Sequence, residues 1–141
     1  MKINVKGLDQ LVRKLKTLPA NIRKDTISDI QDAADSIVRD AGNAAPVDLG
    51  TLKQSIWNFP RNGGLNYVIR VDAKHAPYIE FGTGTEVEVP TELTAYAEQF
   101  RGEGKKDINL PARPFFFPAY IKQRSELIKN LKDTIKSNLR K

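Results

Sequence analysis

The chain has 141 residues, of which 40% are apolar and 28% are charged, a composition typical of one domain with a modest core and a well-solvated surface. It contains no cysteine, which excludes disulfides and thiolate metal sites and fits a protein made in a reducing cytoplasm. No apolar run approaches the roughly 18 residues needed to cross a membrane. Residues 1–7 lack the apolar core of a signal peptide.

The net charge of +6 is divided unevenly along the chain. Residues 1–24 carry seven Lys and Arg against one acid, and residues 118–141 carry seven against two. Residues 25–117 carry nine Lys and Arg against fourteen acids. Basic ends and an acidic middle fit a nucleic-acid binder, copies that dock through opposite charges, or ordinary solvated helix faces. The charge pattern alone leaves all three open.

The first half of the chain predicts a strand, two helices and a hairpin. Ile3 and Val5 alternate with polar residues, as in a short strand. Residues 8–18 have helical periodicity and stop at Pro19. A second helix is predicted over residues 20–44, with an apolar stripe of Ile27, Ile30, Ala34, Ile37 and Ala41. A helical turn over residues 51–55 then leads to strands at 56–59 and 65–71, joined by a Gly-rich turn at 60–64.

The second half predicts shorter pieces and one long helix. Residues 76–82 have Pro near the start and Gly at the end, as in a single helical turn, with a short strand as the alternative. Residues 86–89 alternate like a strand, and Thr91 can cap a short helix that holds Leu93, Tyr96 and Phe100. Pro118 is predicted to open the last helix, whose apolar face is Ile121, Ile128, Leu131, Ile135 and Leu139.

These elements predict one α+β domain over residues 1–141. N-terminal helices and a C-terminal amphipathic helix pack on a small, mainly antiparallel β-sheet. Residues 84–111 form an extended loop and short-helix insertion. Isolated, this insertion buries little, so Tyr96 and Phe100 are predicted at or near a subunit contact.

The sequence offers no assembled active site. His75 is the only histidine, with no second nitrogen or sulfur donor near it, so a structural hydrogen bond or a surface position is favoured over a metal site. Residues 81–85 lack the Lys-Ser/Thr of a P-loop, and a turn with positive φ explains Gly82 and Gly84. We therefore expect no catalytic, metal or cofactor residues.

The run Phe115-Phe116-Phe117 lies between two prolines. If it is extended, alternation buries two rings and turns the third outward. An outward ring favours a partner surface, so Phe116 and Phe117 join the predicted subunit interface. A position in the core accounts for part of the run and is the alternative.

Three segments, in order, resemble a known family. They are residues 45–56 (A-P-V-D-L-G-T-L-K-Q-S-I), 75–83 (H-A-P-Y-I-E-F-G-T) and 112–119 (A-R-P-F-F-F-P-A). This is similar to the neck or tail-completion family of long-tailed phages and prophages, to which the lambda tail-completion protein Z is related. Leu49 and Lys53 depart from the family pattern, which usually has Thr and Arg there. The motif residues are interpreted as scaffold: Pro46, Asp48, Gly50, Leu52, His75, Pro77, Tyr78, Glu80, Phe81, Gly82, Arg113, Pro114, Phe115 and Pro118.

The resemblance implies a virion protein of the neck, made in the bacterial host cytoplasm. It would form a homo-oligomeric, six-fold ring between the head-completion or connector proteins and the tail-terminator or tail-tube proteins, touching passing DNA only non-specifically and no membrane. In this scaffold Asp48 caps a turn, and Arg113 pairs with Glu80 or with a backbone carbonyl. A tail terminator and a basic nucleic-acid-binding module are the alternatives.

Overall fold

The computed structural model describes residues 7–47, 50–83, 91–99 and 110–140. The expected strand at Ile3 and Val5 and the expected strand at 86–89 lie outside these residues. The predicted α+β class is confirmed: the described chain is mainly helical, with one two-stranded antiparallel sheet.

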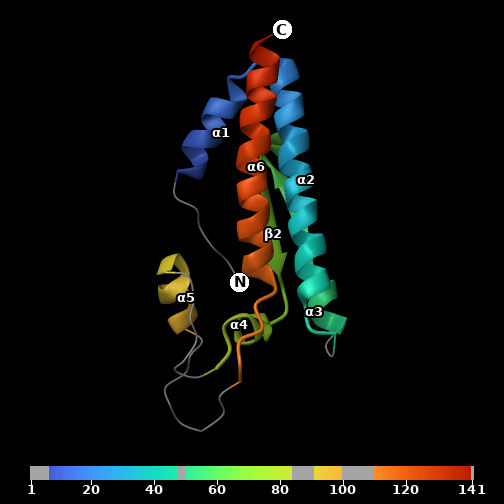
Figure 1. Ribbon diagram of the computed structural model, residues 1–141, viewed down its shortest axis with the longest axis vertical. Helices are drawn as coiled ribbons and strands as arrows, with labels where there is room; N and C mark the ends of the chain where they lie inside the picture. The colour runs from blue at the N-terminus through green and yellow to red at the C-terminus, as the bar shows by residue number, and fades with distance from the viewer. Residues whose placement is uncertain (1–6, 48–49, 84–90, 100–109, 141) are drawn as a thin grey trace.

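Two long helices form the body of the molecule. Helix α2 (Ala20–Ala44) and helix α6 (Phe116–Leu139) run antiparallel and side by side, with the hairpin behind them (Figure 1). Helix α2 has the predicted bounds because proline punctuates both of its ends: Pro19 is the N-cap residue, and Ala45 adopts extended backbone before Pro46.

The hairpin packs on α2. Strands β1 (Ile56–Arg61) and β2 (Asn66–Val71) pair in a register that sets Ile56 opposite Val71 and Arg61 opposite Asn66. The strand β1 continues through Pro60, two residues past the predicted end. The turn η1 (Asn62–Gly64) is correspondingly shorter than predicted.

Short helices complete the fold. Helix α1 (Leu8–Lys16) precedes α2, and α3 (Gly50–Gln54) links α2 to the hairpin. Helix α4 (Ala76–Phe81) follows the hairpin, and η2 (Thr91–Leu93) leads into α5 (Thr94–Glu98). Helices α3 and α4 lie at the end of the bundle where α6 begins (Figure 1). Each of the helical pieces predicted in this region is therefore present.

The buried apolar residues form two clusters. The larger joins α2, the hairpin, α4 and the start of α6, with Ala41, Leu52 and Phe115 fully buried. The smaller lies under α1, where Val12 and Leu15 pack with Leu65. The larger cluster lies at the end of the molecule where the three family-like segments meet.

Helix α6 corrects one prediction. It begins at Phe116, not at Pro118, and three residues of its predicted apolar face are exposed: Ile121 at 47%, Ile128 at 45% and Leu139 at 74%. The face turned toward α2 carries polar residues among its apolar ones, and Gln123 on it is buried. No helix in the described chain is long and apolar enough to span a bilayer.

The polar seam between α2 and α6 also bears on the charge pattern. Gln123 donates to Asp40 at 2.9 Å, Thr134 donates to Asp29 at 2.6 Å, and Asn138 donates to Asp25 at 3.2 Å. Aspartates of the acidic middle are thus hydrogen-bonded by the basic C-terminal helix of the same subunit. Lys122 of the same helix also pairs with Asp40 at 3.6 Å, so part of the opposite charge of the two regions is compensated within the fold.

Candidate functional site

The three family-like segments converge on the N-terminus of α6. Residues 45–56 contribute Leu52, which is fully buried, and residues 75–83 contribute Phe81, which is 3% exposed. Residues 112–119 contribute the three phenylalanines. The Phe81 ring lies 5.6 Å from the Phe117 ring, centroid to centroid. Segments far apart in the sequence therefore share one core.

Glu80 is the polar centre of this arrangement. Its side chain is 2% exposed, and its carboxylate accepts hydrogen bonds from three successive backbone N–H groups. Oε2 accepts from Phe115 and from Phe116, and Oε1 accepts from Phe117, each at 2.9 Å. The positive end of the α6 dipole and the free N–H groups of its first turn suit a carboxylate there. A residue of α4 thus caps a helix that starts 36 positions later.

The prolines around the phenylalanine run reduce the number of backbone N–H groups that need an acceptor. The N–H of Arg113 donates to the carbonyl of Ile79 at 2.8 Å. Pro114 and Pro118 carry no N–H, and the three residues between them donate to Glu80. Every backbone donor from 113 to 118 is therefore satisfied or absent, as a buried helix start requires.

This geometry corrects two expectations. Phe115, Phe116 and Phe117 are 0%, 7% and 4% exposed, so the expectation of an outward ring is wrong, and the interface role of Phe116 and Phe117 stays a prediction without that support. The run begins a helix instead of lying in a strand, so strand alternation does not apply. Arg113 is exposed, and no ion pair joins it to Glu80 in the described chain, where the amides occupy the carboxylate.

Gly82 lets two segments of the chain approach closely. Its φ is +70°, and a Cβ there would lie 2.6 Å from the carbonyl oxygen of Leu110 and 2.8 Å from the nitrogen of Ala112. Beside it, the N–H of Thr83 donates to Leu110 O at 3.0 Å. A side chain at Gly82 would push the third segment away from the second.

The remaining motif residues surround this core. Pro77 is buried in the first turn of α4, whereas Tyr78 is 46% exposed. His75 is half-buried, and its Nε2 is buried without a hydrogen-bond partner in the described chain. Its backbone carbonyl accepts from Ile79 at the start of α4. Pro46 is half-buried, Gly50, Pro114 and Pro118 are exposed, and Asp48 lies outside the described residues, so its capping role stays a prediction.

The insertion residues are also partly placed. Tyr96 is half-buried and packs edge-on against Phe81, with ring centroids 6.0 Å apart. Ala97 beside it is fully buried, so α5 contributes to the subunit's own core. Phe100 lies outside the described residues. The proposed subunit contact of these two side chains stays a prediction.

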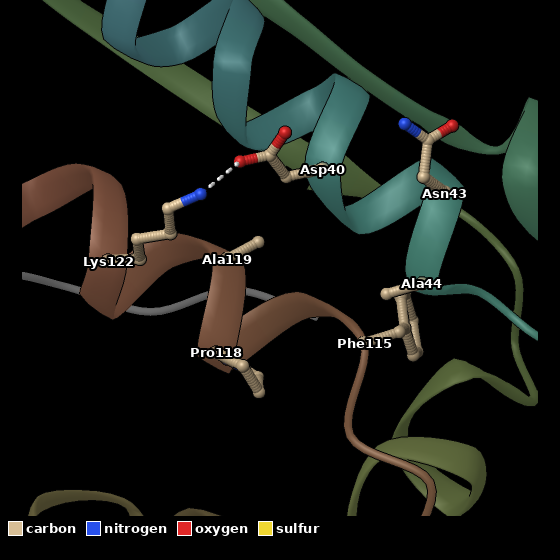
Figure 2. Close-up of a pocket in the computed structure, with 7 residues that line it drawn as sticks. All are labelled: Asp40, Asn43, Ala44, Phe115, Pro118, Ala119 and Lys122. Carbon is tan, nitrogen blue, oxygen red and sulfur yellow. Dashed lines mark ion pairs between the residues drawn. The ribbon is translucent and has the colours of Figure 1, made fainter.

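An open hollow of about 410 Å³ lies where the end of α2 faces the start of α6 (Figure 2). Asp40, Asn43 and Ala44 line it from α2, and Phe115, Pro118, Ala119 and Lys122 line it from the opposite side. Lys122 Nζ lies 3.6 Å from Asp40 Oδ2. The Gln123 hydrogen bond, with help from Lys122 and Arg39, lowers the pKa of Asp40. The acid is therefore held charged by its neighbours and is poorly suited to proton transfer.

The site has the character of a scaffold. The buried carboxylate of Glu80 is occupied by the backbone amides that it caps. The charged residues of the hollow, Asp40 and Lys122, form an ion pair. No group of three or more His, Cys, Asp or Glu residues that could hold a metal is present in the described chain. Sequence reasoning named Glu80 but missed its partners, because they are backbone amides and leave no residue signature.

These features define an α+β domain built around one buried helix cap, Glu80. The family model described as "Bacteriophage HK97-gp10, putative tail-component" matches residues 9–82, which is more than half of the chain. The chain therefore belongs to the HK97-gp10-like family and is a structural component of a phage tail. The match covers α1 to α4 and ends before the segment that starts α6. No significant match is found among curated proteins or among solved structures.

Proposed function

We propose that this protein acts in the phage neck, where it completes the tail and joins it to the head as part of a ring between connector and tail tube. The observation that carries the proposal is the convergence of the three neck-like segments on one buried cap. Glu80 belongs to the second segment and holds the backbone of the third, while Leu52 of the first packs in the same cluster. Family membership as a tail component supports the same assignment.

The same geometry supports a role in the particle without catalysis. The described site holds no nucleophile–base pair, and its buried carboxylate has all of its donors supplied by main chain. We expect the purified protein to show no hydrolase or nuclease activity and to bind no stoichiometric transition metal.

The phenotype of a gene deletion distinguishes a neck protein from a tail terminator. Deleting the gene of a neck protein should give filled heads and separate tails of normal length. Deleting a terminator should give tails of abnormal length, because an uncapped tube keeps adding subunits. Locating a labelled copy of the protein in intact particles tests the neck assignment by itself, and a label anywhere but the head–tail junction would contradict it.

One feature, on the outer face of the hairpin, favours the nucleic-acid-binding alternative. There Arg70 lies 5.4 Å from the centre of the Trp57 ring, and Arg61 lies 5.2 Å from the centre of the Phe59 ring. Basic and aromatic side chains interleaved on one face are typical of single-strand binders. These rings, however, stack on each other and already have the chain's own guanidinium groups over them, and Arg70 is also paired with Asp72 at 3.2 Å. Their faces are poorly available to bases, which favours the structural assignment.

A further inference from the structure

The apolar stripe of α6 faces away from the helix that α6 packs against. Ile121 and Ile128 are nearly half exposed, one helical heptad apart. Residues two apart on a helix point to different sides. Gln123, two positions after Ile121, is buried and bonded to Asp40 of α2. The isoleucines therefore lie on the side of α6 away from the seam with α2.

Basic side chains border this stripe. Arg124 is three residues after Ile121 and four before Ile128, and Lys132 is four after Ile128, so all four are neighbours on the helix surface. Arg124 and Lys132 are exposed, and neither forms an ion pair within the described chain. A partner for this face must offer apolar surface with acidic groups beside it.

The same molecule carries such a surface on the opposite side of α6. A groove of about 130 Å³ runs between α2 and α6, with Asp29, Asp32 and Glu126 among its lining residues and with Ala33 and Leu127 as its apolar part. Asp32 is exposed and takes part in none of the ion pairs of the described residues.

Glu126 lies two positions before Ile128, which turns the groove and the stripe to different sides of the helix. One chain thus presents two different and complementary patches. An interface between two different patches links successive subunits in the same orientation, and the chain of subunits closes into a ring when the rotation permits.

We propose that the Ile121–Ile128 stripe, with Arg124 and Lys132, docks into the acidic α2–α6 groove around Asp32 of a second copy of this chain. The inference rests on the proposed ring and names the surface that builds it. The isoleucines exclude water at the centre of the contact, and the cations pair with the carboxylates at its rim. Self-association should accordingly weaken as salt rises.

The first test is self-association of the full chain, measured by sedimentation over a range of concentrations. The double variant Ile121→Glu/Ile128→Glu should associate at least about tenfold more weakly than the wild type, because it places charge at the apolar centre of the contact. Leu11→Glu is the matched control: Leu11 is 48% exposed but lies on α1, so it should associate normally. Circular dichroism should show all of these variants folded, since the changed positions are exposed.

The second test is a charge swap. Lys132→Glu and Asp32→Lys should each weaken association alone, through like-charge contacts. Mixed in equal amounts, the two variants should recover it, since each contact then joins opposite charges. Lys74→Glu, an exposed change off this face, is the control and should match the wild type.

Three results would overturn the proposal: a wild-type chain that stays monomeric at every concentration, undiminished association of the double isoleucine variant, or failure of the mixture to recover. Loss of duplex-DNA binding on reversal of Arg124 and Lys132, with association unchanged, would instead make this face a nucleic-acid surface. None of these outcomes depends on where the protein sits in the particle. Particle labelling and the deletion phenotype test the neck assignment separately.

Discussion

Removing the Glu80 carboxylate should lower the stability of the protein more than any change at the surface. In Glu80→Ala, three buried N–H groups at the start of α6 lose their acceptors. Each buried unsatisfied donor costs roughly 1–3 kcal/mol, and the loss of a desolvated carboxylate returns part of that sum. A net loss of about 3–5 kcal/mol is expected, out of a total stability of about 5–15 kcal/mol.

The amide variant separates hydrogen bonding from side-chain size. Glu80→Gln keeps an oxygen for two of the three donors but sets an NH₂ group against the third. Its loss should be roughly 1–3 kcal/mol, between the wild type and Glu80→Ala. The order wild type, Gln, Ala is therefore the signature of a cap, whereas a packing role would make Gln nearly neutral.

Thermal and urea unfolding followed by circular dichroism measure both variants. One kcal/mol corresponds to roughly 3–4 °C for a domain of this size, so Glu80→Ala should melt about 10 °C or more below the wild type. Glu126→Ala, an exposed acid on α6 itself, serves as the control and should change stability by less than about 0.5 kcal/mol. Equal melting temperatures for Glu80→Ala and Glu126→Ala would refute the capping argument.

Three further changes probe the same end of the molecule. Gly82→Ala should destabilise by about 1–3 kcal/mol, because φ is +70° and the new Cβ meets backbone at 2.6 Å, while Gly50→Ala, which meets nothing within 4 Å, should be neutral or slightly stabilising in urea melts. Leu52→Ala should cost about 2–5 kcal/mol, since Leu52 is fully buried, and a loss near zero in the same melts would contradict its place in the core. The pKa of Asp40 is lowered, so its contribution to stability is present above its unfolded pKa and is lost as pH falls through its folded pKa. Gln123→Ala should raise the pKa of Asp40, measured by NMR titration of the carboxyl, and should reduce the loss of stability at acid pH. An unchanged pKa of Asp40 in this variant would show that the hydrogen bond does not cause the lowered pKa.

Secondary structure was predictable from the sequence where proline or glycine residues bound a segment of regular hydrophobic periodicity. Pro19 and Pro46 flank a long helical pattern, and α2 has the predicted bounds. The Gly-rich turn between two alternating segments predicted the hairpin. Gly82 was predicted to need positive φ, and it has it. The lone His75 and the lack of cysteine argue against a metal site from composition alone.

Packing between distant segments was not predictable in this way. The phenylalanine run fits a strand or a helix equally well by itself, and only Glu80, some 36 residues earlier, selects the helix by accepting its first amides. Backbone amides belong to every residue, so no side-chain pattern announces that partnership. The expected pairing of Arg113 with Glu80 failed for the same reason, because those amides occupy the carboxylate.

The sequence by itself determined the order and type of the elements, because helix and strand periodicities, caps and breakers act over a few residues. The buried face of α2 also follows its predicted stripe, since Ala34, Ile37 and Ala41 are buried, but only the tertiary structure decided which face of α6 is buried. For α6 the difference is plain: the apolar stripe at Ile121 and Ile128 remains exposed, while Gln123 is buried against α2. The bonds of Gln123, Thr134 and Asn138 to the aspartates of α2 fix that choice, and they exist only once two helices some 80 to 115 residues apart have met.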